Sequence, residues 1–558
     1  MAGSAIFDWS RLKGLWPSDR RPIARNAAAP NELRSGFTVP ALAAVATAVL
    51  FELAGSAPGW YPCAILAPLP ILAVAPEIRT ERAAQFAFVA YFFGNLVAWG
   101  GESFAVPLIT MFASHVAGAI VFATFVACAA EATRRWSGVL AALVFPTFET
   151  AFYFALAGQS PHGTWGSPAY SQVGFAPLMQ SASWLGMAGV MFIMSLLPSG
   201  LAVAWYRRRW NMEWIRPAEM AVGVFAIAVV LGWIRIIRTP ATPAVRVAMV
   251  ASDRLIPQSE STDPSDAANI VALYANLVRR AATGGPQMVV LPEKAVGVAP
   301  GYEWDVVQGF QRIASMSHVW LVVGINQIGR TPKRNIAVVF NADGKIVAAY
   351  AKHHPIPSLE SDYKAGSKPA FFDAPWGRTA ILISQDLDFP GTARELAANG
   401  VRVVMAPASD WPGSEVIHQR MAVLRGVESG FSLARASRGG MVSASDSRGR
   451  MTATGAAIHG QDAVVLAQLP LGTGSTLYTR GGDWFGRACV ILTILLMLRL
   501  AVSIAAAERR RRLGAATRIR PSGVLSVDVG NPAHPVEHAA SEEEERIYRP
   551  PTRRPENY

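Results

Sequence analysis

The chain contains little cysteine. Its 558 residues include only Cys63, Cys128 and Cys489, and each of the three lies in a strongly apolar stretch. The more polar region between residues 245 and 480 has none. This absence excludes a disulfide, a thiolate metal site and a thiol nucleophile from that region. It also lacks a cluster of histidines with the spacing of metal ligands, so we expect neither a metal nor a cofactor.

Charge is also scarce, because charged residues make up 16% of the chain and hydrophobic residues 51%. The apolar residues gather in segments close to the ~20 residues that a membrane-spanning helix needs. The segments are 36–54, 60–76, 83–99, 104–130, 137–157, 185–206, 218–237 and 485–507. They predict a multi-pass α-helical membrane bundle of about eight spans.

Lys and Arg are absent from every second connection between these segments, namely 55–59, 100–103 and 158–184. The leader and the other connections carry Arg11, Lys13, Arg20, Arg21, Arg25, Arg34, Arg79, Arg82, Arg134, Arg135, Arg207, Arg208, Arg209 and Arg216. Positive residues stay on the cytoplasmic side, so both termini are expected there and residues 245–480 on the periplasmic side. These flanks account for most of the net charge of +12, and a nucleic-acid partner is not expected. The aromatic-rich loop 158–184 is expected at the membrane interface.

From Val245 onward, short β-branched runs alternate with amphipathic helical stretches, which predicts an α/β domain. One clear helix is expected at 266–283, with Ser265 or Asp266 as its cap. The predicted organisation is a cytoplasmic polar leader (1–35), a membrane bundle (36–237), an α/β domain (245–480), a final transmembrane helix (485–507) and a disordered cytoplasmic tail (508–558).

Three chemically capable residues follow strand-like runs of this domain. Glu293 comes after Met288–Leu291, Lys352 after Ile346–Ala351, and Ser384 after Thr379–Ile383. A carboxylate can act as a general base, and a lysine can stabilise the negative charge that develops on a carbonyl oxygen. Together with a nucleophile they indicate a site for acyl or amide chemistry.

The chain resembles the apolipoprotein N-acyltransferase family, the membrane branch of the carbon–nitrogen hydrolase (nitrilase) superfamily. The resemblance covers about 36–507. It rests on Leu291-Pro292-Glu293, Tyr350-Ala351-Lys352-His353-His354-Pro355, Ala406-Pro407-Ala408-Ser409-Asp410-Trp411, the helix 418–428, and Trp165 through Gln172. It implies a nitrilase-like αββα sandwich on the bundle, with Glu360 as a further site residue. The implied reaction moves an acyl chain from a phospholipid donor to the N-terminal amine of a lipoprotein.

The sequence departs from the family at the nucleophile, because the family's Cys-Tyr-Glu-like segment reads Ser384-Gln385-Asp386. A serine hydroxyl is less acidic than a thiol, so a base must activate it. Three interpretations stay open: a serine acyltransferase, a catalytically inactive homologue that binds lipid or lipoprotein, and an amidase-like hydrolase. Asp386 and Ser409 are expected only to line the pocket.

Four ionisable residues lie in or near the apolar segments: Glu52, His115, Glu131 and Glu149. Such groups are costly inside a membrane and often functional. A pairing of His115 with Glu149 inside the bundle is one interpretation. A transporter is the alternative that these residues suggest, but the chain shows no inverted repeat.

Overall fold

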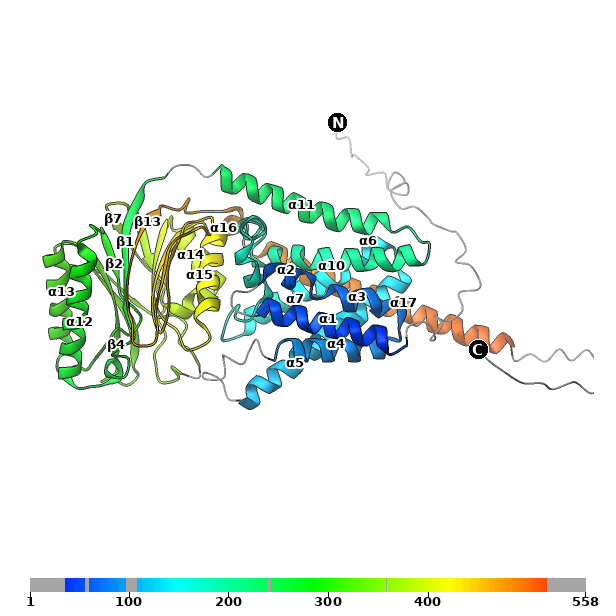
Figure 1. The fold of residues 1–558 in the computed structure, drawn as a ribbon, viewed down its shortest axis with the longest axis horizontal. Coiled ribbons are helices and arrows are strands. Elements are labelled where there is room, and N and C mark those ends of the chain that lie inside the picture. Colours follow the sequence, from blue (N-terminus) through cyan, green and yellow to red (C-terminus); the bar gives the residue numbers. More distant parts are fainter. Residues whose placement is uncertain (1–35, 56–59, 97–107, 239–241, 358, 519–558) are drawn as a thin grey trace, which may run out of the picture. The chain divides into compact units, whose positions relative to one another are not determined.

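The computed structural model describes residues 36–55, 60–96, 108–238, 242–357 and 359–518. The leader predicted at 1–35, the loop 56–59 and the tail from residue 519 therefore lie outside the described residues. The chain divides into two compact units, Met1–Ser503 and Ile504–Tyr558. The first unit holds both a helical bundle and an α/β domain (Figure 1).

In the described part of the chain, six helices are long and apolar enough to cross a membrane. They are α1 (Thr38–Gly55), α5 (Leu108–Arg135), the stretch Gly138–Gln159 made of α6 (Gly138–Ala142) and α7 (Val144–Gln159), α10 (Met187–Arg209), α11 (Ile215–Ile237) and the Trp484–Leu513 part of α17 (Trp484–Arg518). All six correspond to predicted spans.

The other two predicted spans form shorter helices. The segment 60–76 divides into α2 (Tyr61–Leu66) and α3 (Leu69–Val74), because Pro68 has no N–H to donate and its ring disfavours a continuous helix. The segment 83–99 forms α4 (Thr80–Gly94). Of the eight spans expected, six are therefore long helices and two are shorter helical segments within the described residues.

Helix α10 forms the centre of the bundle. In its most apolar 18-residue window 78% of the residues are buried, whereas the corresponding share is 17% for α11. It packs against α3, α7 and α11. A helix that is apolar all round is buried by its neighbours, and α10 follows that rule.

The α/β domain contains two sheets. One has the order β13-β1-β2-β4-β5-β6, with β3 paired to β4, and the other has the order β12-β11-β10-β9-β8-β7. The first sheet consists of β1 (Ala244–Ser252), β2 (Met288–Val290), β3 (Val296–Val298), β4 (Trp320–Gln327), β5 (Arg334–Phe340), β6 (Ile346–Ala351) and β13 (Asp462–Pro470). The second consists of β7 (Ala370–Ala374), β8 (Gly377–Ile381), β9 (Val403–Ser409), β10 (Ser432–Arg438), β11 (Gly440–Ser445) and β12 (Met451–Ala457).

Alternation along β1 explains how the layers form. Val247 and Met249 belong to the core shared with the second sheet, whereas Ala248 and Val250 belong to the core beneath two helices. Those helices, α12 (Pro264–Ala282) and α13 (Glu303–Ser317), cover the first sheet. Helices α14 (Pro390–Ala398) and α15 (Glu415–Ser429) cover the second (Figure 1). This confirms the αββα sandwich.

Three details differ from the sequence predictions. The cap of α12 is Asp263, whose side chain accepts from Ser265 N, rather than Ser265 or Asp266. Helix α17 continues to Arg518, so the segment predicted as a disordered tail from 508 starts as helix. In loop 158–184, which was expected at a membrane interface, Tyr170 is fully buried inside the protein, and Trp165 packs on His418 of α15.

Candidate active site

The predicted site residues all lie in the interior of the α/β domain. Glu293 follows β2, Lys352 follows β6, and Ser384 lies three residues beyond β8. Glu293, Lys352 and Glu360 are only 3%, 1% and 2% exposed, and Ser384 is 8% exposed. Charged groups are almost never this buried without partners, so their pairing decides what the site can do.

Lys352 joins the two predicted carboxylates. Its Nζ lies 2.7 Å from Glu293 Oε1 and 2.8 Å from Glu360 Oε2. Burial by itself lowers the pKa of Lys352, but attraction by Glu293 and Glu360 outweighs it and the pKa rises above its ordinary value. Lys352 therefore carries a fixed positive charge in a dry site.

Two further residues, Asn335 and Lys294, complete this cluster and were missed in the sequence. Asn335 Nδ2 donates to Glu293 Oε1 at 2.6 Å and to Glu360 Oε1 at 2.9 Å. Lys294 Nζ lies 2.8 Å from Glu360 Oε1. Burial by itself raises the pKa of Glu360, but attraction by Lys352 and Lys294 outweighs burial and brings the pKa down to about 2. Neither residue follows a sequence pattern that distinguishes it from its neighbours.

Ser384 begins a 3₁₀ turn (Ser384–Asp388) with a backbone φ of 43°. A residue with a side chain disfavours this left-handed backbone conformation. The conformation costs about 1–3 kcal/mol and persists only where the surrounding structure holds it. Such strained residues cluster at functional sites. The turn is fixed by Asp386, which is fully buried.

Asp386 connects the Ser384 turn to the chain around Lys352. Its Oδ2 accepts from Ile383 N at 3.0 Å and from Tyr350 OH at 2.8 Å. Its Oδ1 accepts from His353 N at 3.1 Å and His354 N at 2.9 Å. The sequence suggested only a pocket-lining role for Asp386, but the structure makes it the anchor that brings the Ser384 turn beside the Lys352 segment.

The loop between α7 and α10 covers the same turn. Gln385 Nε2 donates to Pro161 O at 3.1 Å, and Thr164 N donates to Asp388 O at 3.0 Å. Gly163 has φ of 55°, and a Cβ there would lie 2.5 Å from Asp388 O, so only glycine permits this approach. The membrane bundle therefore contacts the turn that carries Ser384.

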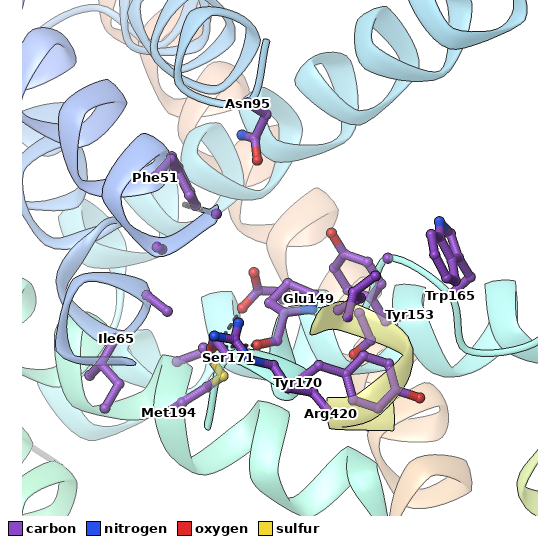
Figure 2. A pocket seen from close by; sticks show the side chains of 18 of the residues that line it. Phe51, Ile65, Asn95, Glu149, Tyr153, Trp165, Tyr170, Ser171, Met194 and Arg420 are labelled. Atoms are coloured by element: carbon purple, nitrogen blue, oxygen red, sulfur yellow. Dashed lines mark hydrogen bonds between the residues drawn. The ribbon is translucent and has the colours of Figure 1, made fainter. Parts of the chain in front are cut away.

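The same loop also lines a cavity of about 300 Å³. Its wall comes from α1, α2, α7, α10, the loop itself and the start of α15, and Figure 2 shows Phe51, Ile65, Met194, Trp165 and Tyr170 around it. The lining is mainly apolar. Because Thr164 binds the Ser384 turn and the next residue lines the cavity, the cavity adjoins the candidate site.

Glu149 lies in this cavity wall (Figure 2). Its carboxylate accepts a hydrogen bond from Ser195 Oγ. The suggested pair of His115 and Glu149 is wrong. The ring nitrogens of His115 instead contact the carbonyl oxygens of Met111 and Asn95, at 2.9 Å and 3.0 Å. The two side chains find separate partners because α5 and α7 present them to different neighbours.

The comparisons with known proteins cover both parts of the chain. Residues 246–480 match the carbon-nitrogen hydrolase family, and residues 47–199 match the apolipoprotein N-acyltransferase N-terminal domain. The apolipoprotein N-acyltransferase of Geobacter metallireducens is 26% identical over 500 residues, which cover 80% of this chain and 93% of the relative. The chain belongs to the apolipoprotein N-acyltransferase family.

Two further proteins are similar to parts of the chain. The apolipoprotein N-acyltransferase of Shewanella oneidensis is 25% identical over 378 residues, covering 61% of this chain and 70% of the relative. Among solved structures, an amidase from Nesterenkonia sp. is 18% identical, with a TM-score of 0.36, over 45% of this chain and 94% of the amidase. Family membership and the six apolar helices make the chain a bacterial inner-membrane protein.

The buried cluster of Lys352, Glu293 and Glu360 in this N-acyltransferase family member predicts that the free energy of unfolding depends on pH. The folded pKa of Glu360 is about 2, below the ordinary value of 4.5, so ionised Glu360 stabilises the fold above pH 4.5. As the pH falls from about 4.5 towards 2, we expect the free energy of unfolding to drop by about 3 kcal/mol from this group. Chemical denaturation in detergent, followed by tryptophan fluorescence, measures it.

The variant Glu360→Gln is the comparison for this prediction, since it removes the titrating group. It should be less stable than the native chain at neutral pH and should lose less stability on acidification. Glu213→Gln, at an exposed ion pair with Arg216, is the matched control and should follow the native curve. Parallel curves for the native chain and Glu360→Gln would contradict the assignment.

Proposed function

We propose that this chain transfers an acyl group from a phospholipid to the N-terminal amine of a lipoprotein, through an acyl ester on Ser384. Membership of the apolipoprotein N-acyltransferase family supports this activity. The arrangement of Ser384 supports its role as the nucleophile. It occupies a strained turn whose anchor, Asp386, also binds the segment that carries Lys352. This is the observation on which the proposal rests.

In the first half-reaction, Ser384 Oγ attacks the ester carbonyl carbon of the phospholipid while Glu293 takes the hydroxyl proton. The carbonyl oxygen becomes negatively charged, and the Lys352 ammonium stabilises it. The C–O bond to the glycerol then breaks, and Glu293 returns the proton to the leaving oxygen. The products are a lysophospholipid and an acyl ester on Ser384.

In the second half-reaction, the free amine of the lipoprotein attacks the acyl ester. Glu293 accepts a proton from the amine, and Lys352 again faces the charged oxygen. Ser384 Oγ leaves with that proton, and an amide bond remains on the lipoprotein. Glu360 holds Lys352 in place through its 2.8 Å contact and takes no proton itself.

The cavity beside the site supports a lipid donor. It is mainly apolar, and its walls include the membrane helices α1, α7 and α10, so an acyl chain reaches it without entering water. We further propose that the α/β domain is periplasmic and that both termini are cytoplasmic. The concentration of Lys and Arg in alternate connections supports this orientation.

An assay of the purified chain in detergent tests the activity. The substrates are a phospholipid labelled in its acyl chain and a diacylated lipopeptide with a free N-terminal amine, and label on the lipopeptide is measured. We expect label to move to the lipopeptide as an amide that withstands mild alkali. Release of labelled fatty acid alone would favour an amidase-like hydrolase, and binding of both substrates without either product would favour a binding-only homologue.

A further inference from the structure

Arg425 is a fully buried arginine on α15, outside the cluster of Lys352, Glu293 and Glu360, with no exposed side-chain surface. A guanidinium is costly to bury, and a buried one is kept only where its donors are satisfied. Its hydrogen-bond partners therefore indicate its role. They come from three separate segments of the chain.

The first partner is the turn that carries Ser384. Arg425 Nε donates to Leu387 O at 3.0 Å, and Leu387 is the fourth residue of the Ser384–Asp388 turn. The second partner is the loop of the membrane bundle. Arg425 Nη2 donates to Thr164 Oγ1 and to Tyr170 OH, each at 3.2 Å. Thr164 also binds Asp388 O, so the guanidinium closes a small network around the end of the turn.

The third partner is Glu428, one helical turn further along α15, which forms an ion pair with Arg425 Nη1. The other oxygen of Glu428 accepts from Met187 N at 2.8 Å, at the first residue of α10. The pair thus connects the central helix of the bundle to the Ser384 turn. Tyr170, which accepts from Arg425, also lines the 300 Å³ cavity, and Figure 2 shows it there.

We propose that Arg425 is a positioning residue for acyl transfer. Its planar guanidinium group holds the Ser384 turn against the loop between α7 and α10. It thereby sets the position of Ser384 Oγ relative to the cavity and to Lys352. A lysine keeps the charge opposite Glu428 but has no rigid fork, so it cannot reach Leu387, Thr164 and Tyr170 together. The transfer step rests on the proposed function, whereas the positioning of the turn does not.

The first test compares Arg425→Lys with Arg394→Lys. Arg394, on α14 of the same domain, is the matched control because it pairs with Asp483 and its hydrogen bonds do not involve the turn. A displacement of about 1 Å at a reacting atom can cost about 10²-fold in rate. We expect Arg425→Lys to lower kcat about 10²-fold with KM changed less than about threefold, because the cavity remains. Arg394→Lys should retain native kinetics.

The second test measures the environment of residue 384 through the reactivity of a thiol placed there, and it does not depend on acyl transfer. In a Ser384→Cys background, the alkylation rate of the introduced thiol by iodoacetamide is measured against pH, and peptide mass spectrometry separates it from Cys63, Cys128 and Cys489. Because Asp386 holds the turn against His353 and His354, next to Lys352, the Lys352 ammonium should lower the thiol pKa below about 8.5. Adding Arg425→Lys should move the profile back towards that value and slow alkylation at pH 7 about tenfold, and adding Arg394→Lys should not.

These readouts separate the two hypotheses. If the native chain transfers no acyl group but the alkylation profile shifts with Arg425→Lys, the proposed function fails and the positioning role stands. If the profile and kcat both match those of Arg394→Lys, the positioning role is wrong. Should Arg425→Lys fail to fold, Thr164→Val with Tyr170→Phe removes the loop partners instead and should give the same shifts to a smaller extent. Native values for that pair overturn the inference.

Discussion

Replacing Ser384 with alanine is expected to abolish acyl transfer to a diacylated lipopeptide, with a loss of at least about 10³-fold in rate. The variant removes the atom that forms the acyl ester, and a missing nucleophile leaves only binding and charge stabilisation. The protein should still fold, because Ser384 contributes a small side chain and alanine removes one oxygen. Transfer of labelled acyl chain and the thermal unfolding midpoint measure the two effects.

The matched control for this variant is Ser443→Ala, which removes a hydroxyl from another buried serine of the domain, on β11. It should retain activity within about twofold, because Ser443 lies on β11, outside the Ser384–Asp388 turn. Equal transfer by the native chain and Ser384→Ala would show that Ser384 is not the nucleophile.

Ser384→Cys adds a third comparison. A thiol has a pKa near ~8.5 and is a better nucleophile than a hydroxyl, so acyl-enzyme formation should be at least about tenfold faster. Activity in the cysteine variant alone would instead indicate a retained pocket whose nucleophile is not functional in the native chain.

The second large effect is expected at Lys352. The variant Lys352→Met should lower the rate about 10²–10³-fold, the usual result of removing one group that stabilises a developing oxyanion. It should also lower the free energy of unfolding by about 3–5 kcal/mol, because it leaves buried Glu293 without a cation. Glu360 retains Lys294 at 2.8 Å. Steady-state transfer kinetics and chemical denaturation measure the two losses.

A double variant separates the two effects of Lys352. In Lys352→Met with Glu293→Gln, the unpaired carboxylate is gone, so a large part of the lost stability should return while the rate of transfer stays at least as low as in Lys352→Met. Lys333→Met is the matched control, since Lys333 forms an exposed ion pair with Asp362 and its loss should change stability by less than about 1 kcal/mol. If the double variant regains activity with stability, the role of Lys352 is structural only.

Much of the fold could be predicted because its signals are local. The position of Ser384 after a buried strand, like that of Glu293, follows from a short continuous apolar run of strand length, and Lys352 likewise follows a short strand-like run. The apolar segments likewise predicted the long helices. The prediction failed where a proline interrupts an apolar segment, as at Pro68, and where the helix α17 continues through an arginine-rich sequence.

The partners in the site could not be predicted in the same way. Asn335 contacts Glu293 across 42 residues of sequence, and Asp386 contacts Tyr350 across 36. Arg425 contacts Thr164 across 261 residues, between the α/β domain and the membrane bundle. Such pairs depend on how sheets and helices pack, and a periodic pattern carries no information about them.

The sequence by itself therefore determined the six long apolar helices, the absence of a thiol from the α/β domain, and the placement of Glu293, Lys352 and Ser384 after strands, because these depend on composition and on local sequence patterns. The tertiary structure alone decided that Lys352 lies between two buried carboxylates and that Ser384 adopts a left-handed turn anchored by Asp386. Both features arise where distant segments meet in the buried interior of the domain, so only their packing can fix them.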